Sequence, residues 1–171
     1  MQWIESVCNK FSKYLGIFIA FLLIIMMINV AFDTLNRYLM NSNSVALQEM
    51  EWHLFSVIIL LGTSYALSEE GHVRVDIFYT NFSAKKKAII NMIGVITFVL
   101  PLSLLIAFGS LGFVEEAYNF MEQSGDPGGL PYRFIIKGLI PTSFFILIFM
   151  SVGYFARNYN LLKRLNSGSK S

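Results

Sequence analysis

Residues 14–32 read YLGIFIAFLLIIMMINVAF, nineteen consecutive residues without an Asp, Glu, Lys or Arg. An α-helix rises 1.5 Å per residue, so this stretch would reach about 28 Å, close to the roughly 30 Å hydrocarbon core of a bilayer. Three further stretches lack these charged residues, at 52–68, 88–114 and 138–156. The pattern predicts an all-α integral membrane protein with four transmembrane helices.

The composition leads to the same class of protein. The 171-residue chain is 55% hydrophobic and 14% charged, with a mean hydropathy of +0.58. A soluble domain carries about 25% charged residues. We expect a single membrane domain over residues 1–171, with spans near 14–32, 50–68, 88–114 and 138–156. The first span is expected to be retained and not cleaved as a signal peptide. The third is long enough to require a tilt or a kink, for which Pro101 supplies a cause.

Basic residues are distributed unequally between the two sides of these spans. The N-terminal segment, the loop 69–87 and the C-terminal tail together hold ten Lys and Arg residues, and the other side holds three. Under the positive-inside rule the ten belong in the cytoplasm, so both termini are predicted to be cytoplasmic. The small net charge of +2 and its placement between apolar blocks argue against a nucleic-acid partner.

Two segments outside the spans have an amphipathic pattern. Residues 1–13 place Trp3, Val7 and Phe11 on one helical face, which predicts a short N-terminal amphipathic helix in the membrane interface. Residues 71–82 have similar character. Residues expected to contact lipid headgroups are Trp3, Lys85, Lys86 and Lys87.

The spans contain no residue set that indicates catalysis or a bound cofactor. Ionisable groups inside a membrane are costly and usually functional, and the four stretches lack Asp, Glu, Lys and Arg. We therefore expect a chain that is not an enzyme, holds no cofactor and transports nothing alone. Haem ligation by His53 and His72 is an alternative, although the two would lie about 28 Å apart along one helix. A metal site at Glu49, Glu51 and His53 is another.

Several short strings resemble the small membrane subunit, DctQ-like, of tripartite ATP-independent periplasmic (TRAP) transporters. Their order and their placement around four spans carry the resemblance. The strings are NRY at 36–38, QEMEWHLF at 48–55, LGTSYAL at 61–67, GHVRVD at 71–76, DPGGLP at 126–131 and KGLIP at 137–141.

The resemblance implies an accessory subunit in the inner membrane of a bacterium. Its partners would be a large membrane permease subunit, membrane lipids and, transiently, a periplasmic substrate-binding protein. The system would import an organic acid (a sialic acid, a dicarboxylate or an oxo acid) using a sodium gradient. The polar tail 166–171 favours a polypeptide separate from the permease. A redox-complex membrane anchor and an independent small carrier remain alternatives.

Ten residues are candidates for contacts with partners or for bracing the scaffold. Glu49, Glu51 and Trp52 either dock a partner or simply begin a helix, and Arg37 is expected to pair with one of the two glutamates. Each remaining candidate has a plain structural alternative, such as close helix packing, an amphipathic connector or a solvated loop. These candidates are Gly62, His72, Arg74, Asp76, Asp126 and Arg133.

Overall fold

The computed structural model describes residues 2–69 and 82–168, and these residues form helices and short connections without a strand. The helices are α1 (Gln2–Met40), α2 (Val45–Ser68), α4 (Ala84–Gly94), the π-helix η1 (Val95–Val99), α5 (Leu100–Gly109), α6 (Leu111–Asn119) and α7 (Arg133–Gly168). Four helical stretches are long and apolar enough to cross a membrane, and α4 to α6 together make up the third. The predicted all-α architecture with four spans is therefore confirmed.

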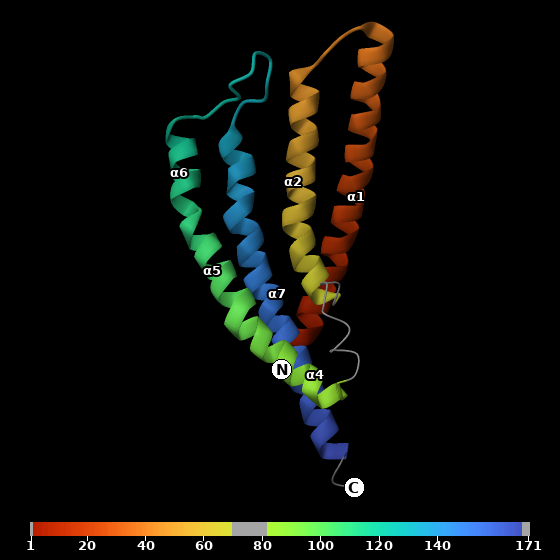
Figure 1. Cartoon of the computed structure of the whole chain (residues 1–171), viewed down its shortest axis with the longest axis vertical. Coiled ribbons are helices and arrows are strands. Elements are labelled where there is room, and N and C mark those ends of the chain that lie inside the picture. The colour runs from red at the N-terminus through yellow and green to blue at the C-terminus, as the bar shows by residue number, and fades with distance from the viewer. Residues whose placement is uncertain (1, 70–81, 169–171) are drawn as a thin grey trace.

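The helices run alternately up and down, and they diverge toward one end (Figure 1). The connections 41–44 and 120–132 lie at this end, which we call the loop end. Helix α1 begins and α7 finishes toward the opposite end, which we call the terminal end. Because the chain crosses four times, its two termini must lie at the same end of the bundle.

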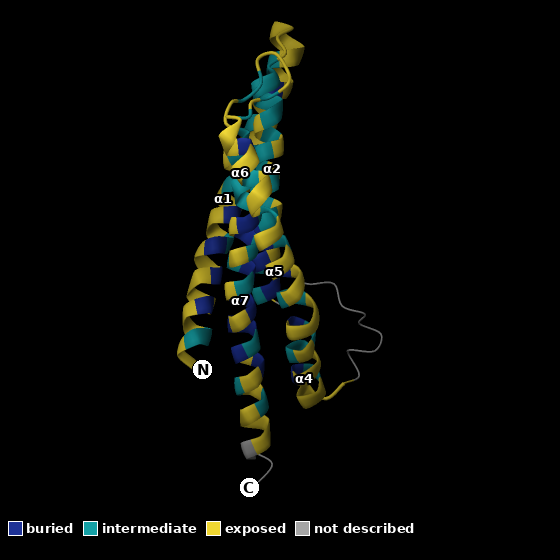
Figure 2. Ribbon diagram, turned by 90° about the vertical axis from the view of Figure 1, so that its left-hand side faces the viewer, coloured by how far each residue is buried: buried dark blue, intermediate teal, exposed yellow. Residues whose placement is uncertain are grey.

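Helix α7 lies at the centre of the fold. It packs against α1 and α2 on one side and against α4, α5 and α6 on the other, while the main contact of α1 is with α2. Buried residues follow α7 through its middle, as the dark blue segments in Figure 2 show. The four spans thus form an open arrangement built on one helix.

Two faces of α7 account for these contacts. One face meets α1: the Phe149 ring stacks edge-on against Phe11 with centroids 5.8 Å apart, and Gly153 lies directly under Cys8. A Cβ on Gly153 would come within 2.4 Å of the Cys8 Sγ, so the two helices approach closely only because this position has no side chain.

The other face of α7 meets the third helical stretch. Leu147 and Tyr154 form a buried cluster with Val95 and with Leu67 of α2. Farther along, the Asn91 amide donates to the Oδ1 of Asn158 at 3.1 Å, and Asn158 is buried. A hydrogen bond between paired amides satisfies groups that would be costly to bury alone in an apolar environment.

The N-terminal segment differs from its prediction as a separate interfacial helix. Residues 2–13 are helical, but they continue without interruption into the first span, since α1 contains no proline. Phe11, which the sequence places on the face toward the membrane interface, contacts α7 instead, and so does Cys8. Trp3 remains 77% exposed, as a headgroup contact requires.

The third stretch changes its helical geometry where Pro101 requires it. Proline has no N–H to donate, and its ring clashes with the carbonyl four residues earlier. The π-helix η1 ends at Val99, two residues before this proline, and the Leu100 N–H donates to the Val95 carbonyl, five residues back. This wider turn accommodates Pro101 within an otherwise continuous span, which follows a curved course in Figure 1.

Candidate functional site

The side chain of Glu49 joins α2 to the loop before α7. Its Oε1 accepts a hydrogen bond from the Arg133 guanidinium at 3.0 Å and another from the Ser124 hydroxyl. Its Oε2 accepts from the Leu130 backbone N–H at 2.6 Å. The Glu49 side chain is only 13% exposed. We call these four residues, Glu49, Ser124, Leu130 and Arg133, the clasp.

The loop sequence explains how the chain forms the clasp. Asp126 to Gly129 make a β-turn in which the Gly129 N–H donates to the Asp126 carbonyl at 3.0 Å. Proline at the second position and Gly128 at the third, with φ +83°, are the residues that a type II turn needs. The Ser124 N–H donates to the Leu130 carbonyl at 3.2 Å, which closes the loop around the turn.

Position 129 must be glycine, because the side chains of Ser124 and Glu49 lie very close to it. A Cβ at this position would lie 2.4 Å from the Ser124 Oγ and 2.9 Å from the Glu49 Oε2. Any side chain there would force the loop away from the glutamate. Gly125, four residues earlier, has open space around it.

A second polar contact links α6 and the loop after it to α7. Lys137 forms an ion pair with Glu122, and its Nζ lies 3.9 Å from the centre of the Phe113 ring. A cation above an aromatic face is attracted to the ring's negative quadrupole. The clasp and this pair together connect α2, the loop and α6 to the first turns of α7.

Arg37 does not pair with Glu49 or Glu51, contrary to the prediction. It forms an ion pair with Asp33, one turn earlier in α1. This is possible because α1 continues to Met40, beyond the predicted end of the first span. Asp33 is fully buried, and its Oδ1 has no hydrogen-bond partner among the described residues; neither has the Oε1 of Glu51.

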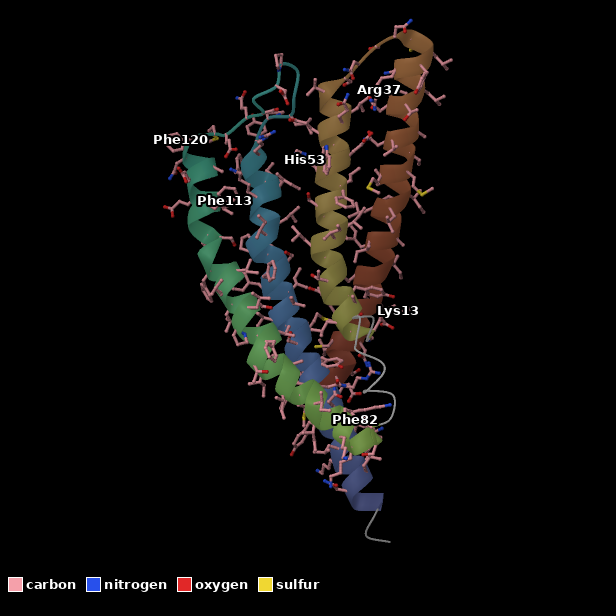
Figure 3. All side chains as sticks on the ribbon, in the orientation of Figure 1. Lys13, Arg37, His53, Phe82, Phe113 and Phe120 are labelled. Atoms are coloured by element: carbon pink, nitrogen blue, oxygen red, sulfur yellow. The ribbon has the colours of Figure 1, made fainter. Side chains whose placement is uncertain are left out.

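A groove opens between α2 and α7 at the loop end. Its polar part has a volume of about 460 Å³ and is lined in part by Glu49, Trp52, His53, Asp126 and Arg133. Figure 3 labels His53 on α2 at this groove. Four of the predicted partner residues are therefore brought together: Glu49, Trp52, Asp126 and Arg133.

The groove continues toward the membrane interior as an apolar cavity. This part has a volume of about 370 Å³ and shares Ser56, Ile136 and Lys137 with the polar part. Its walls are otherwise apolar: Phe55, Ile59, Leu60 and Ile140. The groove is thus polar at the loop end and apolar below it.

The remaining candidate residues are dispersed. Gly62 is half-buried with open space beyond it, while its neighbour Ser64 faces inward and donates to the Ser143 carbonyl at 3.5 Å. Lys85 and Lys86 are exposed and Lys87 is half-buried. His72, Arg74 and Asp76 lie outside the described residues.

The alternative metal site at Glu49, Glu51 and His53 does not form. No group of three His, Cys, Asp or Glu side chains within 2–69 and 82–168 is arranged to hold a metal ion. Glu49 instead directs both of its oxygens to the clasp.

Sequence reasoning missed Ser124, Gly129 and the Lys137–Glu122 pair. The turn residues of 125–129 signalled a tight loop, but no local pattern indicates its partner. Ser124 lies 75 positions from Glu49, and Arg133 lies 84 positions from it.

These features define a multi-pass membrane protein with four apolar helices and a polar clasp at one end of the bundle. The sequence profile for the DctQ component of tripartite ATP-independent periplasmic transporters matches residues 22–161. The chain therefore belongs to this family, which is a family of transporter components. No individually curated protein matches the chain.

Replacing the clasp carboxylate should loosen the loop end. In Glu49→Gln one oxygen becomes an amide NH₂, which cannot accept the bonds from Arg133 and Ser124. We expect the melting temperature of the purified protein to fall by a few degrees. Because the two partners act together, adding Arg133→Gln to Glu49→Gln should lower it little further.

Two controls accompany this measurement. Glu115→Gln removes an exposed carboxylate from α6 and should leave the melting temperature unchanged. Gly129→Ala should lower it, while Gly125→Ala should not. Fully additive effects of Glu49→Gln and Arg133→Gln would show that the clasp does not act as a unit.

Proposed function

We propose that the chain is the small membrane subunit of a sodium-coupled, binding-protein-dependent transporter that imports an organic acid. The match to the DctQ component over residues 22–161 carries this proposal. In this proposal, the chain resides in the inner membrane of a bacterium and pairs with a large permease subunit. The permease and the binding protein hold the substrate, and this chain enlarges the membrane scaffold on which the permease moves.

The groove between α2 and α7 is our proposed contact with the permease. Trp52 stands at its rim and is 69% exposed, and Arg133 lines it. Exposed Trp and Arg residues beside a partly apolar depression are the types that contribute most to interfaces between proteins. The apolar lower part can receive side chains from a partner helix within the membrane.

Loss of the chain should abolish uptake, and loss of Trp52 should weaken the complex. We expect the large subunit to co-purify with the wild-type chain and to be recovered in clearly lower yield with Trp52→Ala. Phe98→Ala is the matched control, because Phe98 is 74% exposed on η1, away from the groove. Uptake at the full rate in a strain that lacks the chain would contradict the proposal.

We also propose that the terminal end faces the cytoplasm. The support is the excess of Lys and Arg at that end, where eight of the described residues are basic against three at the loop end. Negative charge predominates at the loop end, which would then face the periplasm.

Labelling with a membrane-impermeant maleimide tests this orientation. In a Cys8→Ser background, which removes the one native cysteine, Gly125→Cys should react in intact spheroplasts. Lys163→Cys should react only after the membrane is opened. The reverse pattern would contradict the orientation.

The binding protein is proposed to approach the loop end. Glu115, Glu116 and Asp126 are exposed there and offer negative potential to a partner. Charges at the rim of an interface act mainly on association rates, which fall as the salt concentration rises.

Neutralising these carboxylates should therefore change the kinetics of docking. With Glu115→Gln and Glu116→Gln combined, which do not line the groove, we expect uptake to need more binding protein for half-maximal rate and to depend less on salt. Co-purification with the large subunit should be unchanged. An unaltered requirement for binding protein would exclude a role for this acidic surface.

A further inference from the structure

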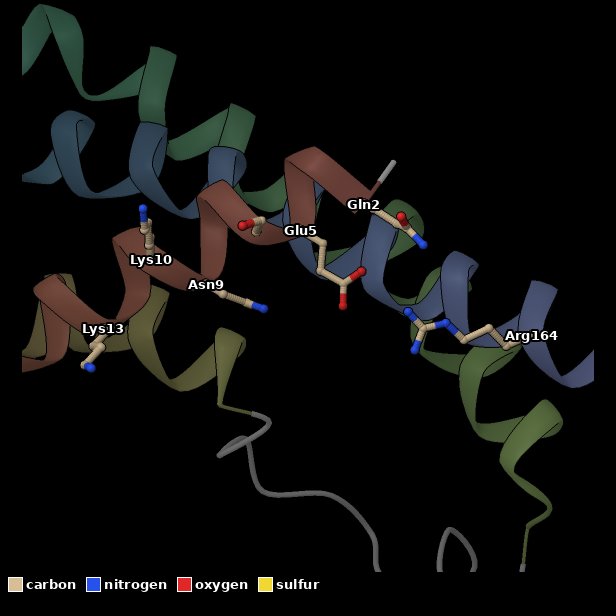
Figure 4. A pocket seen from close by; sticks show the side chains of 7 residues that line it. Gln2, Glu5, Asn9, Lys10, Lys13 and Arg164 are labelled. Atoms are coloured by element: carbon tan, nitrogen blue, oxygen red, sulfur yellow. The ribbon is translucent and has the colours of Figure 1, made fainter.

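A basic groove lies at the terminal end of the bundle, opposite to the loop end that holds the clasp. It has a volume of about 580 Å³ between the first turns of α1 and the last turns of α7. Three cationic side chains line it: Lys10 and Lys13 from α1 and Arg164 from α7 (Figure 4). Gln2 and Asn9 add two amides.

The charges in the groove are unequal. Its lining holds three cations and one carboxylate, Glu5, which gives a net charge of +2. Glu5 already accepts a hydrogen bond from the Asn160 amide at 2.7 Å. Lys10 and Lys13 are exposed and lie on neighbouring turns of α1. The groove therefore attracts an anion.

The depth of the groove in the membrane indicates the kind of anion. The charge-free stretch of the first span begins at Tyr14, directly after Lys13. Lys10 lies four residues before Tyr14, about 6 Å from it along the helix axis and away from the span. Trp3 and Tyr14, exposed by 77% and 69%, mark the region where aromatic rings meet lipid headgroups. Lys10 and Lys13 consequently lie at the level of lipid phosphates.

Apolar surface continues from the groove toward the membrane interior. Tyr14 and Ile17 are exposed on the adjoining turns of α1. An occupant with acyl chains can lay them against these side chains, whereas a free phosphate ion makes no use of this surface. Burial of apolar chains adds to the attraction between the charges.

We propose that this groove is a specific site for one anionic phospholipid. The Lys10 and Lys13 ammonium groups bind the phosphodiester, and the Asn9 amide beside them donates to headgroup oxygens. Phosphatidylglycerol, with a net charge of −1, fits this set. Phosphatidylcholine does not, because its quaternary ammonium would meet the same cations.

Native mass spectrometry of the full chain in detergent tests the site. The probes are phosphatidylglycerol and phosphatidylcholine with the same acyl chains, each added at matched concentrations. We expect one phosphatidylglycerol to be retained per chain in preference to phosphatidylcholine. Each lysine beside an anionic headgroup contributes about fivefold in affinity, so Lys10→Gln with Lys13→Gln should weaken binding by about twenty-fivefold.

Charge-matched variants separate this site from general electrostatic attraction. Lys85→Gln with Lys163→Gln removes the same charge from exposed positions that do not line the groove, and it should change binding little. Lys10→Arg with Lys13→Arg should retain the lipid. Equal losses in the two glutamine pairs, equal retention of both lipids, or displacement of the lipid by inorganic phosphate would each overturn the proposal.

Discussion

Close packing along α7 is the constraint on which the rest of the structure depends. The α1–α2 pair and the α4–α6 stretch have their principal interhelical contacts with this one helix. In the hydrocarbon core of a membrane, the hydrophobic effect does not drive helices together, because lipid tails are as apolar as the side chains. Helix association there depends on van der Waals contact and hydrogen bonds. Small residues at Gly153, Ser151 and Ser143 allow that contact, and the buried Ser151 hydroxyl donates to the Leu147 carbonyl at 2.7 Å.

At the loop end the helices diverge, and directional polar contacts take over from packing. Glu49 receives three donors there, and Lys137 pairs with Glu122 on the neighbouring side of α7. Such contacts suit the headgroup region, where water lowers the cost of holding charged groups. They also leave the groove between α2 and α7 open. The single Glu49 side chain that reaches across from α2 fills far less space than a packed layer of apolar side chains would.

The sequence predicted the four spans because charge-free length is a direct measure of what can cross a bilayer. It did not predict where the helices end, because hydropathy marks the membrane boundary and helices continue past it. Helix α1 runs eight residues beyond Phe32, and this continuation gave Arg37 its partner in Asp33 in place of Glu49 or Glu51. Glu49 and Arg133 were both recognised as candidates, yet their pairing depends on a long-range contact that no local pattern encodes.

The two ends of α7 thus have different physical characters, and this difference bears on how an accessory subunit can work. In the role proposed above, a scaffold must be stiff where it is anchored and accessible where it meets the permease. The terminal end is packed through α1, α4 and α7 and carries the cations that match lipid headgroups. The loop end combines an exposed tryptophan, an amphipathic groove and a polar clasp. A permease seated in the groove would therefore bear against helices whose opposite ends are fixed by packing, so displacement of the partner is resisted through α7.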